Sequence, residues 1–113
     1  MKQLARILFL FGMIGFASKV YAKVTVEQWQ KDKNEFFMHL TGIATGLSWA
    51  NTALESNNQT RLYCPPATIS LNFLNDIDIL ENIIRNRRFP PDTPIGMVLL
   101  LGYQDTLPCS NQK

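Results

Sequence analysis

Cysteine and histidine, which often perform catalysis or hold metal ions, are scarce in this sequence, with two cysteines and one histidine among 113 residues. It lacks the C-x-x-C, H-E-x-x-H and G-x-S-x-G motifs and any glycine-rich phosphate loop. His39 falls in a helical pattern, where a lone histidine is usually a surface or packing residue. Asp76, Asp78 and Glu81 lack the glycine and the terminal glutamate of a calcium loop, so we expect them on a solvated helix face. The sequence therefore predicts no catalytic residue, no metal and no cofactor, and a protein that is not an enzyme.

Long apolar runs are missing beyond the first residues of the chain. The run 7–16, of about ten apolar residues, has the length of a signal-peptide core. A membrane span needs roughly 20 such residues. Two basic residues precede the run, and the compact side chains at 20–22 match a signal-peptidase site. We therefore predict a signal peptide at 1–22, cleaved after Ala22, and a periplasmic domain at 23–113 that is not held in the membrane.

A basic excess is also missing once this segment is removed. Lys2, Arg6 and Lys19 leave with the signal peptide, so the 11 basic residues of the whole chain fall to 8, against 9 acidic ones. This balance gives no support for nucleic acid as a partner. The basic cluster at 85–88 is placed to complement the C-terminal dipole of a helix rather than to hold a phosphate.

The two cysteines lie in Tyr63-Cys64-Pro65-Pro66 and Leu107-Pro108-Cys109. A small exported domain has a marginal core and an oxidising environment, so an even number of cysteines favours a disulfide. Pairing Cys64 with Cys109 closes a loop of about 45 residues, for which the chain-entropy model gives about 4 kcal/mol. An intermolecular bridge and a functional dithiol remain open, although thiol chemistry usually uses the closer spacing of C-x-x-C.

Apolar periodicity predicts an all-α domain of three to five helices. Thr25 and Gln28 have the spacing of a capping box, and apolar residues then recur at helical steps as far as Leu54. We expect one break in this stretch, near Asn34. Aromatic residues at helical spacing are expected in the core: Trp29, Phe36, Phe37 and Trp49.

Gly42 and Gly46 lie one turn apart within this first helical stretch. Each costs about 1 kcal/mol relative to alanine in a helix, so their presence needs a reason. We expect close packing of another helix against them, with local fraying as the alternative.

A second helix is expected to open at Thr68 or its neighbours, with an apolar stripe from Ile69 to Ile84. Three prolines then make 89–94 a rigid loop. Asp92 or Thr93 is expected to cap a third helix, which Gly102 ends. Its apolar run, 95–101, indicates an element that is buried centrally or covered by a second subunit, and its periodicity also allows a buried strand.

These features together resemble the Rap/Tai-type immunity proteins. The likeness is carried by the segment 42–51, by Tyr63-Cys64-Pro65-Pro66, by Pro94 and by Leu107-Pro108-Cys109. Proteins of this family neutralise peptidoglycan amidases that are delivered by type VI secretion. The resemblance implies a disulfide-bonded all-α fold, often a homodimer, that performs no chemistry. Its protein partner would be an amidase toxin whose active-site cleft it occludes.

Contact residues do not follow from the resemblance, so we place them by physical argument. Filling a cleft favours a preorganised element, and the proline-rich loop 88–94 and the tethered loop 57–63 both qualify. The predicted contact residues are Arg88, Phe89 and Asp92 in the first loop and Asn58 and Arg61 in the second. Phe89 has an alternative place in the core. An alternative function is that of a periplasmic acid or stress chaperone similar to the Hde family, which is also small, helical and held by a single disulfide.

Overall fold

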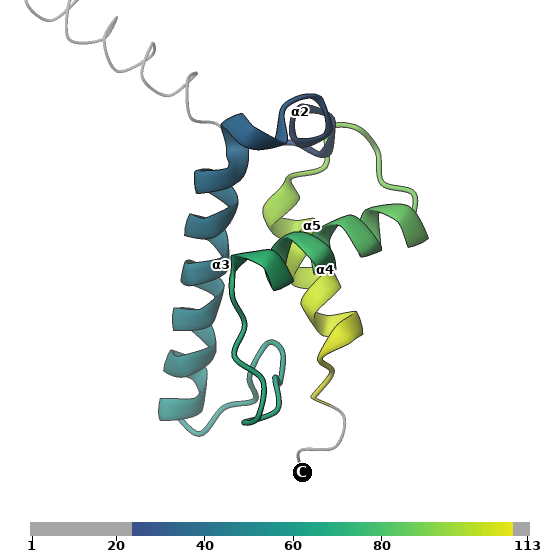
Figure 1. Cartoon of the computed structure of the whole chain (residues 1–113). Helices are drawn as coiled ribbons and strands as arrows, with labels where there is room; N and C mark the ends of the chain where they lie inside the picture. Colours follow the sequence, from purple (N-terminus) through teal and green to yellow (C-terminus); the bar gives the residue numbers. More distant parts are fainter. Residues whose placement is uncertain (1–23, 110–113) are drawn as a thin grey trace, which may run out of the picture.

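The computed structural model describes residues 24–109, so the predicted signal peptide at 1–22 lies outside the described residues. Within 24–109 the chain forms four α-helices and no strand, apart from an isolated β-bridge between Thr25 and Pro94. The helices are α2 (Val26–Lys31), α3 (Lys33–Ser56), α4 (Phe73–Asn86) and α5 (Ile95–Thr106). In Figure 1, α3 lies along one side, while α4 crosses α5 and forms the most extensive helix contact with it. The predicted all-α class is confirmed.

A capping box starts α2 where the sequence predicts it. The Thr25 hydroxyl accepts from the Gln28 N–H at 3.2 Å, and the Gln28 side chain accepts from the Thr25 N–H at 3.0 Å. The one break expected near Asn34 is present and falls at Asp32, before α3. It lies there because the Asp32 carboxylate accepts from the Glu35 N–H at 3.1 Å and so caps α3.

The start of α4 is later than predicted, at Phe73 rather than Thr68. The Asn72 side chain accepts from the Asn75 N–H at 3.1 Å, and the Asn75 side chain accepts from the Asn72 N–H at 3.0 Å. This pair of asparagines forms the capping box that fixes the first turn. Ile69, which was expected on the helical stripe, therefore lies before the helix and is 49% exposed.

Helix α5 is the central element, as its apolar sequence predicts. Ile95, Val98 and Leu99 are fully buried, and Tyr103 is 1% exposed. The expectation that Gly102 ends this helix is wrong, because the helix continues through Gly102 as far as Thr106. The strand alternative for 95–101 is also excluded, because the whole run is helical.

The expected side-chain cap of α5 is not formed. Pro94 occupies the N-cap position without a side-chain hydrogen bond to the helix. Thr93 instead donates its hydroxyl hydrogen to the Pro90 carbonyl at 2.8 Å, and Asp92 is exposed. Proline favours this boundary because its φ angle is fixed and it has no N–H to satisfy.

Close approach of helix backbones occurs at Gly102. A Cβ atom at Gly102 would lie 2.8 Å from Cγ2 of Ile79 and 3.3 Å from Cγ2 of Ile83, both on α4. A Cβ at Gly42 or Gly46 would meet nothing within 4 Å, and both glycines are exposed on α3. The prediction that a helix of the same chain packs against Gly42 and Gly46 is therefore wrong.

Candidate functional site

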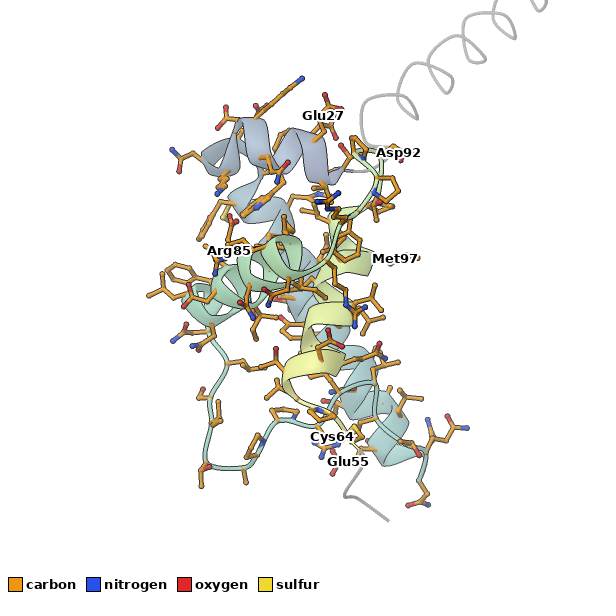
Figure 2. The ribbon with its side chains drawn as sticks, turned by 90° about the vertical axis from the view of Figure 1, so that its right-hand side faces the viewer. Glu27, Glu55, Cys64, Arg85, Asp92 and Met97 are labelled. Atoms are coloured by element: carbon orange, nitrogen blue, oxygen red, sulfur yellow. A yellow bond between two sulfur atoms is a disulfide. The ribbon has the colours of Figure 1, made fainter. Side chains whose placement is uncertain are left out.

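The predicted contact residues lie at two separate ends of the molecule. Arg88, Phe89 and Asp92 belong to the loop between α4 and α5, whereas Asn58 and Arg61 follow α3. Figure 2 shows Asp92 close to Glu27 at one end, with Glu55 and Cys64 at the other. The two sets do not form one surface, so a single cleft would be filled by one set alone.

The loop between α4 and α5 is held by the start of the described chain. The Val26 N–H donates to the Thr93 carbonyl at 2.9 Å, and the Glu27 N–H donates to the Pro91 carbonyl at 3.1 Å. Phe89 is half-buried and packs against the core, as the alternative for this residue predicts. This loop therefore offers the exposed side chains of its charged residues rather than an aromatic anchor.

The basic cluster at 85–88 lies at the C-terminal end of α4, as predicted. Arg85 is in the last turn of the helix, and Arg87 is the C-cap residue. The Arg87 guanidinium pairs with Asp105 of α5 at 2.8 Å. Arg88 is exposed.

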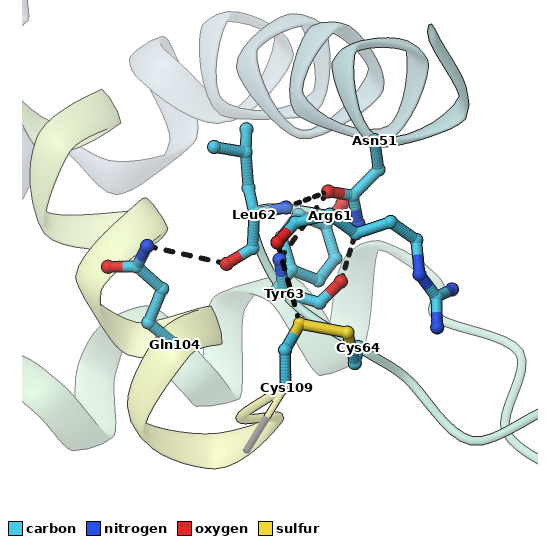
Figure 3. Close-up of a disulfide and its surroundings, with 7 residues drawn as sticks. All are labelled: Asn51, Arg61, Leu62, Tyr63, Cys64, Gln104 and Cys109. Carbon is cyan, nitrogen blue, oxygen red and sulfur yellow. Dashed lines mark hydrogen bonds between the residues drawn. A yellow bond between two sulfur atoms is a disulfide. The ribbon is translucent and has the colours of Figure 1, made fainter. Parts of the chain in front are cut away.

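Cys64 and Cys109 form a disulfide within the chain, as predicted, with an S–S distance of 1.97 Å and a Cα–Cα distance of 5.0 Å. Figure 3 shows the bond beside Arg61, whose carbonyl oxygen lies 3.5 Å from Sγ of Cys109. The Cys64 N–H donates to the Leu107 carbonyl at 2.8 Å. The disulfide thus joins the segment after α3 to the end of α5.

Asn51 fixes the same segment from the opposite side. This residue of α3 is buried, and its side-chain N–H donates to the Tyr63 carbonyl at 2.8 Å. Its side-chain oxygen accepts from the Leu62 N–H at 2.7 Å (Figure 3). Residues 61–64 are therefore held between α3 and α5 by an amide clamp and a covalent bond.

A groove of about 490 Å³ lies between α3, the segment 61–72 and the first turn of α4. One wall is formed by polar residues of α3, and the other includes Ile69, Leu71 and Phe73. Tyr63, Asp76 and Tyr103 also line it. The volume is within the range of small-ligand sites in proteins.

A buried carboxylate and two stacked tyrosines form a connected cluster at this groove. Asp76 is 7% exposed and accepts a short hydrogen bond of 2.5 Å from the Tyr103 hydroxyl. The Tyr103 ring stacks on Tyr63, with 4.4 Å between the ring centroids. Burial raises the pKa of the Asp76 carboxyl, and the hydrogen bond from Tyr103 offsets part of that rise. Burial, followed by the bond to Asp76, raises the pKa of Tyr103 far above its usual range.

The polar wall of the groove consists mainly of hydroxyl groups on α3. Thr41, Thr45 and Thr52 each donate their hydroxyl hydrogen to the carbonyl four residues earlier in the helix, at 2.9 to 3.1 Å. Such back-bonding uses the donor of each hydroxyl group, so that only its oxygen lone pairs remain for a hydrogen bond to a ligand. The groove therefore presents hydrogen-bond acceptors on this side.

Large apolar side chains are exposed around the groove. Ile69 and Phe73 line it and are 49% and 47% exposed. Trp49 is 73% exposed on α3, one turn from Thr45 and Thr52. The expectation that Trp49 lies in the core is therefore wrong, whereas Trp29, at 1% exposure, is a core residue as predicted. Exposed aromatic side chains next to a groove are typical of protein-binding surfaces.

Residues 24–109 contain no group of three or more histidine, cysteine or carboxylate side chains that could hold a metal ion. His39 is exposed on α3, as expected. In the same part of the chain, no helix is long and apolar enough to cross a bilayer. Glu81 is half-buried rather than fully solvated, because it accepts from the Trp29 indole at 3.2 Å and pairs with Lys33 at 2.6 Å.

Sequence reasoning missed three residues of this site: Asn51, Asp76 and Tyr103. Asp76 was expected on the solvated face, yet it lies one turn before Leu80 and two turns before Ile83, which are both buried. That spacing places Asp76 on the apolar stripe of α4, so the sequence pattern could have indicated that this carboxylate is buried. The role of Asn51 carried no such signal, because its partners belong to a loop.

Comparison of the chain with protein-family models, with curated proteins and with solved structures finds no match.

Proposed function

We propose that this protein is a periplasmic immunity protein that binds a secreted peptidoglycan amidase toxin and occludes its active site. The observation that carries the proposal is the intrachain disulfide between Cys64 and Cys109. It joins the Cys-Pro-Pro and Pro-Cys segments on which the resemblance to the Rap/Tai-type proteins rests. The disulfide also fixes residues 61–64 on the helices. Less conformational entropy is therefore lost when this segment binds a partner.

Two preorganised surfaces are available for this role. The loop 88–94 is held by backbone hydrogen bonds to the residues around α2. The surface around the groove is held by the disulfide and by Asn51. We favour the second surface, because Trp49, Ile69 and Phe73 expose large apolar side chains there.

The experiment is co-expression with an amidase toxin from the same gene neighbourhood, both directed to the periplasm, with lysis followed by optical density. We expect the protein to prevent lysis and to inhibit the purified amidase at equimolar concentration. The double variant Arg88→Ala/Asp92→Ala tests the loop 88–94, and Trp49→Ala tests the other surface. Cells that lyse as readily with the protein as without it would refute the proposal for that toxin.

The acid-chaperone alternative gains no support from the buried carboxyl of Asp76. Because the pKa of Asp76 is raised in the fold, its protonation favours the folded state as the pH falls. An acid-activated chaperone needs protonation to release apolar surface instead. Binding of an apolar dye at low pH, together with suppression of client aggregation, would nevertheless favour that alternative.

A further inference from the structure

We infer that the groove beside α3 receives a lysine or arginine side chain from the protein partner, with the Asp76 carboxylate as its counter-ion. This inference rests on the proposed function in one respect, namely that the partner is a protein. The site itself is built from described residues of this chain.

Asp76 supplies a negative charge to the groove. Its side chain lines the groove and is 7% exposed, so the carboxylate is held in place and largely removed from water. Oδ1 accepts a hydrogen bond from the Tyr103 hydroxyl, and no buried side-chain nitrogen or oxygen among the described residues is left without a partner. A buried charge of this kind is stabilised when an opposite charge with hydrogen-bond donors reaches it.

Threonine hydroxyl groups line the α3 side of the groove. Thr41, Thr45 and Thr52 present oxygen acceptors to the groove, because their hydrogens are donated within α3. The side-chain nitrogen of Asn51 donates to the Tyr63 carbonyl, and its side-chain oxygen accepts from the Leu62 N–H. A wall of acceptors is complementary to a group rich in donors. Lysine has three N–H donors and arginine has five, and neither has an acceptor.

Charge and shape agree with this ligand chemistry. The charged residues lining the groove are Glu55, Asp76 and Arg61, so the acids outnumber the bases. Ile69, Leu71 and Phe73 form an apolar wall along which the methylene stem of a long basic side chain can pack.

An anionic ligand fits poorly, although the N-terminus of α4 opens near the groove. Asn72 accepts from the N–H of Asn75 through its side chain and from the N–H of Asp76 through its carbonyl, so two N–H groups of that helix end are already used. Asp76 already supplies a negative charge in the first turn. A second negative charge would therefore meet repulsion rather than the favourable end of a helix dipole.

The test uses L-argininamide as the probe, titrated into the oxidised, ¹⁵N-labelled mature protein and followed by amide chemical shifts. We expect saturable shifts confined to the groove, at residues such as Thr45, Leu71 and Asp76. L-citrullinamide has the same shape without the positive charge, and we expect it to produce no saturable shift. Lysinamide should reproduce the effect of argininamide, because the ammonium group also carries donors and charge.

Variants of the groove test which residues hold the cation. Asp76→Asn should weaken argininamide binding by about tenfold or more, because it removes a buried charged partner. Thr45→Val removes an acceptor at an exposed site and should weaken binding by a smaller factor. Glu27→Gln removes an exposed carboxylate from α2 and serves as the control, with unchanged binding.

Three outcomes would overturn the inference: no saturable shifts, equal binding of citrullinamide, or unchanged binding by Asp76→Asn. Groove shifts that depend on protein concentration and not on the probe would assign the groove to a second copy of this chain. The toxin assay is a separate readout. If argininamide binds the groove but the wild-type protein does not prevent lysis, the immunity function fails while the cation site stands.

Discussion

The same substitution, glycine to alanine, should have opposite effects at two positions of this fold. At Gly46 an added Cβ meets nothing within 4 Å, so alanine gains helix propensity without a clash. We expect Gly46→Ala to stabilise the protein by about 1 kcal/mol. At Gly102 the Cβ would lie 2.8 Å from Cγ2 of Ile79 and 3.3 Å from Cγ2 of Ile83.

These two Cγ2 atoms cannot move away without rotation of a β-branched side chain, which is stiff at χ1. Overpacking of a core typically costs about 1–3 kcal/mol, and the propensity gain offsets about 1 kcal/mol of this. We expect Gly102→Ala to destabilise the protein by about 1 to 2 kcal/mol. Since 1 kcal/mol shifts Tm by roughly 4–8 °C in a domain of this size, the two variants should separate clearly.

The assay is thermal unfolding of both variants and of the wild type, repeated at several protein concentrations. The account predicts a higher Tm for Gly46→Ala and a lower one for Gly102→Ala. A stabilising Gly102→Ala would refute the close crossing of α4 and α5. A concentration-dependent loss of stability in Gly46→Ala would show that the exposed face of α3 is buried against another chain.

Three further predictions concern the groove and the disulfide. Replacing both Cys64 and Cys109 by alanine should lower the free energy of unfolding by about 4 kcal/mol, from the loop-closure entropy of the unfolded chain. Urea unfolding measures this loss, and reduction of the wild type should reproduce it; a loss below about 1 kcal/mol would contradict the entropic reasoning. Asp76→Asn should unfold at a higher temperature than the wild type at neutral pH, because asparagine mimics the protonated carboxyl that the fold prefers. The difference should vanish below the ordinary aspartate pKa of about 3.9, and a difference independent of pH would refute this explanation. Asn51→Ala should cost about 2–4 kcal/mol in urea unfolding, because it leaves two backbone groups of residues 62 and 63 without their partner; a loss under about 1 kcal/mol would show that water replaces the clamp.

The helices follow from the sequence wherever a local signal sets them. The capping box of Thr25 and Gln28 and the apolar run 95–101 both predicted what the structure contains. The pairing of Cys64 with Cys109 followed from their number and the expected compartment. These features depend on neighbours in sequence or on a count, so one sequence is enough to reveal them.

The errors arise where tertiary contacts decide. Gly42, Gly46 and Gly102 are equivalent as glycines in a helical pattern, and only the crossing of α4 over α5 makes Gly102 the close contact. Trp49 was expected in the core because of its helical spacing. It is exposed instead, because no part of the described chain covers it. The groove combines residues from α3, α4, α5 and a loop, so its geometry could not be read from any single segment.

The central claim is that the chain is exported and then closed by the bond between Cys64 and Cys109. Intact-mass spectrometry of the protein recovered from the periplasm tests both parts at once. The account predicts the mass of residues 23–113 less two hydrogen atoms, with no thiol available for alkylation before reduction. A mass that retains residues 1–22, or two thiols that alkylate without reduction, would contradict it.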